Sequence, residues 1–521
     1  KVEEEAKKIS PAITKEEIKK RRDMRGELTF TIDPVDAKDF DDAISFKKIE
    51  ENKYEVGVHI ADVSHYVRQG TKIDEEAQNR ATSVYLVDRV IPMLPETLSN
   101  NLCSLRPNEE KLTFSAVFVM NKNGDIKEEW FGKTITESDV RLSYEEAQHI
   151  IETGEVKIPK EHTILKKEKT VTQKTVEAIT TLNDTAKTIR KKRINNGAII
   201  FDKTEIKFEL DKKNQPENIV FKTTKSSNKL IEEFMLLANK KVAEKMRKSK
   251  ERFVYRVHDQ PDQEKLKNLQ TVVKRLGYNL KLSSGELNDS LNGLLKNAFG
   301  KKEQNLIDTL MIRSMSKAEY TTKNIGHYGL SFENYTHFTS PIRRFSDLVV
   351  HRVIRNSFKN ECGTPFHGEQ TKRCKVEIEL MRVPLYSVED LDDIGYRVSL
   401  SERRADEATR DVANGLKCEY LMDRIGEQFF GMVTQVTSFG LFITLDDLRV
   451  EGLLHVSKLS DDYYEFNPIL HRLTGEKRGH VFQLGQRLNV SINHIIVEQK
   501  KINFDLVTAR FSSKLFRKPD H

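Results

Sequence analysis

The chain has 521 residues, of which 32% are charged and 37% hydrophobic, and its formal net charge is +7. The composition is typical of a globular protein, and the length exceeds what one hydrophobic core usually serves, so we expect a large domain and a smaller one. No run of about 18 apolar residues occurs, which excludes a membrane-spanning segment. The positive charge is equally compatible with a polyanionic partner and with an ordinary lysine-rich surface.

The cysteines indicate the cellular compartment, and the first residue indicates whether the chain is a fragment. Four cysteines, with no CxxC pair and no regular framework, argue against a zinc site and a disulfide scaffold and favour a reducing, cytoplasmic compartment. They are Cys103, Cys362, Cys374 and Cys418. Because the chain begins with Lys1 and lacks an apolar signal segment, we expect it to be a piece of a longer protein.

The first part of the chain predicts a lead-in and then a sheet. Residues 1–25 are dense in charge and read as a helical lead-in or linker. Residues 54–60 place apolar side chains at every second position, which predicts a strand with one apolar face. Residues 114–126 predict a strand that runs into an Asn-Gly turn at Asn123 and Gly124.

Three helices are predicted further along. Apolar residues at three- and four-residue steps between 164 and 193 predict a helix, followed by a strand pair at 197–201 and 205–210. A second helix would begin with Ser340 as its cap and Pro341 in its first turn, which would place Arg343 near a positive helix end. A third would run from 400 to 425, with a domain boundary at its end.

The stretch FTIDPVDAKDFDDAISF, Phe30 to Phe46, places five aspartates within ten residues of a basic chain. Such repulsion is unfavourable unless cations neutralise it. A solvated acidic loop is disfavoured because apolar and aromatic residues flank the cluster. A calcium-binding EF-hand loop is excluded because the turn position that requires glycine would hold Ile44.

A site for magnesium or manganese remains, because these hard ions take a few carboxylates and leave positions for water and phosphate. Two such ions about 4 Å apart would activate a water and stabilise the leaving oxygen of a phosphodiester. The acidic cluster would then hold the metals, and the basic residues of the surrounding protein would attract the nucleic acid.

The stretch TIDPVDAKDFDDA resembles the signature of the ribonuclease II and ribonuclease R family of exoribonucleases. The resemblance continues through VGVHIADVSHYV, TSVYLVDRVIPMLPETLSNNLCSLRP, IEEFMLLAN and HFTSPIRRFSDLVVHR. It implies an α+β fold, with a large mixed catalytic domain of RNB type at residues 26–415 and a small all-β barrel after it. Within the family, the chain is more similar to ribonuclease R.

The resemblance also assigns site residues. The metal and catalytic carboxylates would be Asp33, Asp39, Asp41 and Asp42. Asp36 is not counted among these ligands and is interpreted as a residue that shapes the loop. Arg343 would contact phosphate, a role that suits the paired donors of a guanidinium. Arg344, Asp347 and Arg352 are interpreted mainly as structural pairs.

Further resemblance concerns the grip on the RNA. Tyr85 and Phe201 match two aromatic residues that sandwich the terminal bases, as expected of a nuclease that grips bases by their faces. Glu232 matches a residue that contacts the terminal sugar, with Glu233 as an open alternative. His59 and His65 are interpreted as packed strand residues rather than metal ligands, because magnesium prefers oxygen donors.

Residues 426–509 resemble the S1 RNA-binding domain, a five-stranded OB-fold barrel that stacks single-stranded RNA on surface aromatics. Phe439, Phe442 and His455 match the exposed positions of that motif, whereas Phe430 is expected to lie in the core. Residues 510–521 would form a short basic tail.

The sequence therefore predicts a monomeric, magnesium-dependent enzyme that digests RNA processively from its 3′ end to nucleoside 5′-monophosphates, with manganese as an alternative ion. The substrates would be single-stranded RNA 3′ ends and structured RNA with a 3′ overhang. A non-catalytic RNA-binding protein and a metal-dependent endonuclease stay open as alternatives.

Overall fold

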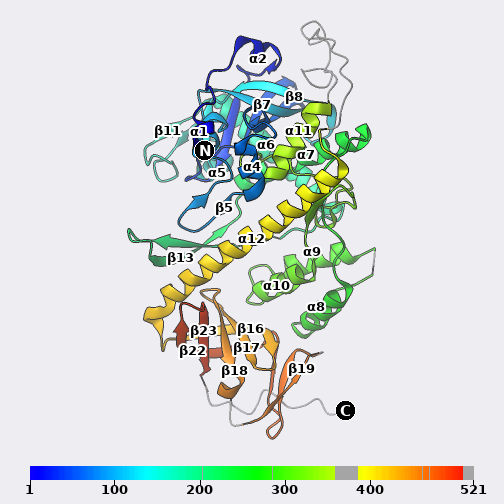
Figure 1. The fold of residues 1–521 in the computed structure, drawn as a ribbon. Helices are drawn as coiled ribbons and strands as arrows, with labels where there is room; N and C mark the ends of the chain where they lie inside the picture. Colours follow the sequence, from blue (N-terminus) through cyan, green and yellow to red (C-terminus); the bar gives the residue numbers. More distant parts are fainter. Residues whose placement is uncertain (202–203, 284, 358–384, 460–461, 469, 508–521) are drawn as a thin grey trace.

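The structure is a computed structural model that describes the chain except residues 202–203, 284, 358–384, 460–461, 469 and 508–521 (Figure 1). The basic tail predicted at 510–521 lies outside the described residues. No helix in the described part of the chain is both long enough and apolar enough to cross a membrane.

A seven-stranded sheet forms the centre of the larger body, in the order β1-β8-β7-β4-β3-β2-β9. Its outer pairs, β1 with β8 and β2 with β9, are parallel, and its inner pairs are antiparallel. The strands are β1 (Arg22–Asp23), β2 (Thr29–Asp33), β3 (Asp42–Glu50), β4 (Lys53–Ala61), β7 (Glu110–Met120), β8 (Ile126–Glu137) and β9 (Val140–Ser143).

The predicted strand at 54–60 is β4, and its alternation of apolar and other residues is confirmed, but the second face is not exposed to solvent. Glu55, Gly57 and His59 are buried as well, because β4 lies centrally in the sheet and both of its faces are covered. The predicted Asn-Gly turn is confirmed between β7 and β8, where Gly124 has a φ of 74° and its N–H donates to the Asn121 carbonyl at 2.9 Å.

Helices surround the sheet, and their apolar residues join the sheet residues in one hydrophobic core (Figure 1). The lead-in contains α1 (Val2–Ala6) and α2 (Lys15–Lys19), and Ala6 of α1 belongs to that core. The others are α3 (Val63–Tyr66), α4 (Lys72–Arg80), α5 (Tyr144–Thr153), α6 (Gln173–Asn195), α7 (Ser226–Ser249) and α11 (Phe345–Ser357).

The helix predicted between 164 and 193 is α6, which ends before Gly197 as expected. The predicted pairing of 197–201 with 205–210 is wrong. Strand β12 (Thr204–Leu210) instead pairs with β13 (Pro216–Thr223). Residues 197–201 are held elsewhere, because the Ile199 N–H donates to the Gly329 carbonyl and Asn292 donates to the Ala198 carbonyl.

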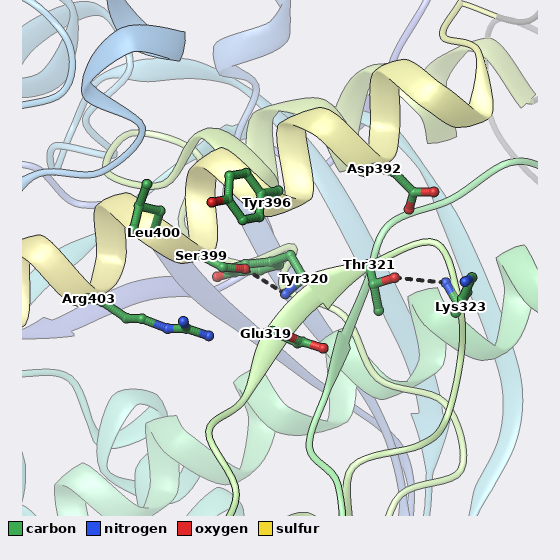
Figure 2. Close-up of a pocket in the computed structure, with 9 residues that line it drawn as sticks. All are labelled: Glu319, Tyr320, Thr321, Lys323, Asp392, Tyr396, Ser399, Leu400 and Arg403. Atoms are coloured by element: carbon green, nitrogen blue, oxygen red, sulfur yellow. Dashed lines mark hydrogen bonds between the residues drawn. The ribbon is translucent and has the colours of Figure 1, made fainter.

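The predicted helix at 400–425 is α12 (Val388–Leu421), which begins twelve residues earlier than expected, at a capping box formed by Ser387 and Asp390. It extends from the larger body to the C-terminal barrel (Figure 1). Figure 2 shows its crossing over β15 (Glu319–Thr321), where the Tyr320 N–H donates to Ser399 Oγ at 2.9 Å. Gly395 permits this approach, because a Cβ there would lie 2.6 Å from the Tyr320 carbonyl oxygen.

The C-terminal part contains the predicted five-stranded closed barrel, in the order β16-β17-β18-β23-β22. Its core includes Val272 and Leu306 from α8 (Gln263–Arg275) and α10 (Gln304–Ser314), and Leu421 from α12. The barrel is therefore packed onto the larger body. Its strands are β16 (Gln428–Thr437), β17 (Gly440–Leu445), β18 (Glu451–His455), β22 (Arg487–Ile496) and β23 (Lys501–Leu506).

Smaller elements complete the described structure. A three-stranded sheet precedes β22 and consists of β19 (Tyr464–Asn467), β20 (Arg472–Gly475) and β21 (Val481–Gln483). Besides β12 with β13, the two-stranded pairs are β5 (Val84–Tyr85) with β6 (Val90–Ile91), β10 (Lys157–Ile158) with β11 (Lys169–Thr170), and β14 (Tyr255–Val257) with β15. Helix α9 (Leu287–Ala298) packs with α8 and α10 in a separate apolar cluster.

Candidate active site

The aspartate cluster lies where two neighbouring strands of the sheet meet. Strand β2 ends at Asp33, β3 begins at Asp42, and the connecting loop carries Asp39 and Asp41. The loop is closed against β4, because the Asp41 carbonyl accepts a hydrogen bond from the Ala61 N–H at 2.9 Å. The four predicted carboxylates thus come from one end of the β2–β3 pair, whereas Asp36 is exposed on the loop.

Burial and mutual repulsion destabilise the ionised carboxylates. Burial is the main cause that raises the pKa of Asp33 and Asp41, and neighbouring Asp42 and Asp39 raise both further. Burial also raises the pKa of Asp42 to about 6, although the positive charges of Arg343 and Arg344 oppose that shift. Several perturbed acids in one cluster mark a candidate functional site.

Two carboxylate oxygens in the cluster are both buried and without a hydrogen-bond partner, Oδ2 of Asp33 and Oδ2 of Asp41. An oxygen in this state costs free energy unless a cation or donor reaches it. An all-oxygen donor set with two such atoms fits magnesium or manganese. The side chains do not form a ready-made coordination sphere, because no group of three or more candidate ligands is found among the described residues.

Arg343 lies beside this cluster. Its Nε is 3.7 Å from Asp41 Oδ2, and 41% of its side chain is exposed. The N–H of the preceding residue, Ile342, donates to Asp41 Oδ1 at 2.8 Å. Asp41 is therefore oriented by a backbone donor, while the guanidinium next to it keeps donors accessible from solvent.

The predicted helix start at Ser340 and Pro341 is wrong, although Arg343 does lie near the N-terminal end of a helix. Helix α11 begins at Phe345, and the four residues before it form a turn. The Arg344 N–H donates to the Ser340 carbonyl, so Ser340 closes this turn rather than capping a helix. Helix formation is delayed because the Phe345 N–H donates to the Ala81 carbonyl of another segment.

Tyr85 also reaches the cluster. It is 41% exposed, and its hydroxyl donates to Asp39 Oδ2 at 3.1 Å. Burial and the charge of Asp39 raise the pKa of this hydroxyl above its ordinary value, so it remains a donor. The structure thus brings one predicted base-stacking residue together with the predicted metal ligands.

Phe201 has different surroundings. Its partly buried ring packs against the apolar cluster of α8, α9 and α10, not against the core under the carboxylates. Its base-stacking role stays a prediction.

The two neighbouring glutamates on α7 differ sharply. Glu233 is buried, and the Arg193 guanidinium donates to both of its oxygens. Glu232 is 47% exposed, with Arg190 3.7 Å away, and burial raises its pKa above the ordinary value. Glu233 therefore has a structural role, and Glu232 is the residue that a ligand can reach.

The barrel presents aromatic side chains on its surface. The rings of Phe439 and Phe442 meet edge to face with 6.1 Å between their centroids, and His455 pairs with Gly440 on the adjacent strand. The expectation that Phe430 lies in the core is wrong, since it is 56% exposed with the Arg487 guanidinium over its ring. The inward position belongs to Gly431, where a Cβ would collide with Ile443.

The interpretation of His59 as a packed strand residue is confirmed. Its ring is fully buried, with its nitrogens 2.7 Å and 2.8 Å from the hydroxyls of Ser115 and Ser45. The same interpretation is wrong for His65, which lies in helix α3 rather than on a strand and is only partly buried, with its Nδ1 3.6 Å from Glu17 of the lead-in.

Sequence reasoning did not single out two residues beside the cluster. Arg141 donates to three backbone carbonyls of the aspartate loop and lies over the Phe40 ring. The pKa of Tyr144 is raised by burial and by the charges of Asp42 and Asp33. Both residues lie on or next to β9, which pairs with β2 so that Ser143 lies opposite Asp33, and this pairing is visible only in the structure.

Comparisons with known proteins agree with this arrangement. The RNB domain model matches residues 21–360, and the S1 RNA binding domain model matches residues 423–506. Ribonuclease R of Aquifex aeolicus is 37% identical over 97% of the chain. The chain belongs to the ribonuclease R family of RNB-domain proteins. Ribonuclease R of Escherichia coli is 36% identical over 98% of the chain.

Solved structures of the family share the fold. The Mycoplasma genitalium RNase R structure in complex with ribose methylated single-stranded RNA matches with a TM-score of 0.85, at 28% identity, and covers 97% of this chain and 75% of that one. The same protein in complex with double-stranded RNA matches with a TM-score of 0.78. The chain spans 68% of the length of the Aquifex protein and 60% of the Escherichia coli protein.

Proposed function

We propose that the chain is a 3′→5′ exoribonuclease that hydrolyses RNA processively and releases nucleoside 5′-monophosphates. The observation that carries the proposal is the combination of buried oxygens without a hydrogen bond on Asp33 and Asp41 and the accessible guanidinium of Arg343 beside them. A binding protein gains nothing from buried repulsive carboxylates, whereas phosphodiester hydrolysis requires both cation ligands and a donor to phosphate.

The cofactor would be magnesium, or alternatively manganese, held by Asp33, Asp39, Asp41 and Asp42. Such ions, when bound, lower the pKa of a water and stabilise charge on phosphate oxygens. The side chains already favour this state, because burial and, to a lesser extent, mutual repulsion raise the pKa of Asp33 and Asp41, and a bound cation would stabilise their ionised forms.

The other residues would hold and orient the RNA. Arg343 would donate to the phosphate that reacts, most strongly as negative charge develops on it. Tyr85 and Phe201 would stack on bases, and Glu232 would accept a hydrogen bond from a ribose 2′-hydroxyl, a contact that favours RNA over DNA.

The barrel would bind RNA upstream of the cut through Phe439, Phe442 and His455. The substrates would be single-stranded 3′ ends and structured RNA with a 3′ overhang, in line with the two RNA complexes of the Mycoplasma protein. We assign residues 26–415 to hydrolysis and residues 426–509 to RNA binding, in a cytoplasmic monomer.

A 5′-labelled RNA, with and without magnesium, tests the proposal. We expect magnesium-dependent loss of one nucleotide at a time from the 3′ end, release of nucleoside 5′-monophosphates and a short labelled remnant. Internal fragments would instead indicate an endonuclease. Binding without any hydrolysis would indicate a non-catalytic RNA-binding protein.

A further inference from the structure

The turn that carries Arg343 is held by one buried carboxylate. Asp347, in the first turn of α11, is fully buried. Its Oδ2 accepts from the Ser340 N–H at 2.8 Å and from Arg344 Nη2 at 2.8 Å. Its Oδ1 accepts from Arg344 Nε at 3.0 Å and from Ser346 Oγ at 2.9 Å. Asp347 therefore connects both ends of the turn from residue 340 to residue 344.

The middle of the same turn faces the aspartate cluster. The Ser340 carbonyl accepts from the N–H groups of Arg343 and Arg344, which closes the turn. This geometry points the Ile342 N–H at Asp41, at 2.8 Å, and places Arg343 Nε 3.7 Å from the same carboxylate. A shift of Ser340 would move the donor to Asp41 and the guanidinium together.

The outer edge of the turn binds the segment that leads to Tyr85. The Ser83 N–H donates to the Arg343 carbonyl at 3.0 Å, and the Phe345 N–H donates to the Ala81 carbonyl at 2.9 Å. Strand β5, which contains Tyr85, begins at Val84, directly after Ser83. The turn thus links the candidate phosphate contact to the candidate base-stacking residue.

The ion pair of Asp347 with Arg344 is not explained by stability alone. Burial opposes the charge on Arg344, but Asp347, together with Tyr320 and Tyr335, raises the pKa of Arg344 above its ordinary value. Replacement of a buried ion pair by apolar residues is often neutral for stability. An apolar pair would, however, leave the buried Ser340 N–H without its acceptor, and the position of the turn depends on that hydrogen bond.

We propose that Asp347 is a positioning residue for hydrolysis. Its acceptor oxygen for Ser340 sets the turn so that Asp41, Arg343 and Tyr85 act on the same end of the RNA. The proposal rests on the exoribonuclease function proposed above. It assigns to Asp347 no contact with the RNA itself.

Two double variants separate positioning from stability. Arg344→Met with Asp347→Asn removes both charges but keeps an acceptor for the Ser340 N–H. Arg344→Met with Asp347→Leu also removes both charges and leaves no acceptor. Both should fold, because neither leaves a buried unpaired charge.

We expect the Asn variant to be the more active of the two, with any loss from the missing Arg344 charge common to both. The Leu variant should lose roughly 10- to 100-fold in kcat with little change in KM for long RNA, as is typical when the partner of a metal ligand is misplaced. It should also leave a longer residual oligonucleotide, because the segment that carries Tyr85 is displaced. Asp74→Asn is the matched control, since it breaks another buried ion pair of α11, with Arg352 at 2.7 Å, without touching the turn.

Hydrogen–deuterium exchange of residues 340–345 gives a readout that does not depend on activity. The Leu variant should exchange faster there than the Asn variant, with the rest of the described chain unchanged. The proposal is overturned if the Leu and Asn variants share the same rate and exchange, or if Asp74→Asn reproduces the kcat defect. A wild-type chain that fails to hydrolyse RNA would contradict the proposed function instead, and exchange would still decide the role of Asp347.

Discussion

The Tyr85 hydroxyl donates a hydrogen bond to Asp39, with 3.1 Å between Tyr85 Oη and Asp39 Oδ2. A side chain expected to stack on a base therefore lies against a carboxylate expected to bind metal. Mutation can remove the hydroxyl of Tyr85 and keep its ring. We expect the ring, not the hydroxyl, to determine binding of the RNA and the length of the end product.

Replacement of Tyr85 by Ala should remove a stacking contact with one base of the RNA. Stacking is worth about 1–3 kcal/mol per base, so short substrates should bind more weakly and the residual oligonucleotide should be one or more nucleotides longer. Replacement by Phe or Trp keeps the aromatic face and should largely preserve the product length. Gel analysis of the end product measures both. Unchanged product length and affinity in the Ala variant would show that Tyr85 does not stack on the RNA.

Replacement of Arg343 by Ala should lower kcat by roughly 100-fold or more and change RNA affinity much less, because its contact with phosphate strengthens as charge develops. Single-turnover rates and equilibrium binding on the same RNA separate the two effects. Arg397→Ala on α12, where Arg397 pairs with Asp393, controls for the loss of one positive charge. A defect confined to affinity would contradict the catalytic role.

Local sequence patterns predicted much of the candidate site. The spacing of the aspartates, with apolar residues around them, was sufficient to indicate a cation site, and the structure adds that they lie where β2 and β3 meet. The contact of Ile342 with Asp41 joins residues 301 positions apart. No local pattern encodes such a contact, because it depends on how α11 packs beside the sheet.

The wrong predictions have local causes. A proline after a serine is typical of a helix start, yet α11 begins only at Phe345, because hydrogen bonds to the 81–83 segment hold the preceding residues in a turn. Phe430 was expected inside the barrel. Strand alternation instead turns Gly431 inward and Phe430 outward.

Stability should depend on pH through buried histidines such as His59. Burial lowers the pKa of His59 to about 3, below its ordinary value of 6.5. Between these two pKa values the unfolded chain protonates His59 and the folded chain does not. The contribution of neutral His59 to the free energy of unfolding is therefore complete above about pH 6.5 and is lost as pH falls toward 3. The slope from one such group is at most about 1.4 kcal/mol per pH unit.

His59→Gln should reduce that slope, because glutamine does not titrate. Urea unfolding between pH 4 and 7 measures it, and His455→Gln, at an exposed position, is the control. An unchanged slope in His59→Gln would contradict the assignment of His59 as a neutral core residue.

Phe439→Ala should weaken binding of long RNA by about 1–3 kcal/mol and leave hydrolysis of a short oligomer nearly unchanged. A point variant is preferable to removal of everything after Gly426, because the barrel core shares Val272 and Leu421 with the larger body. Tyr396→Ala, an exposed aromatic on α12 (Figure 2), is the control. Equal binding by the Phe439 variant and the wild type would exclude this face as an RNA platform.

The most direct test of the aspartate cluster is Asp41→Asn, which keeps the size of the side chain and removes its charge. Hydrolysis and binding of one labelled RNA are measured in magnesium for this variant and the wild type. We predict that hydrolysis is lost while binding is preserved or strengthened, because repulsion of the phosphate falls. Loss of binding in parallel with hydrolysis would show that Asp41 supports the fold rather than the reaction.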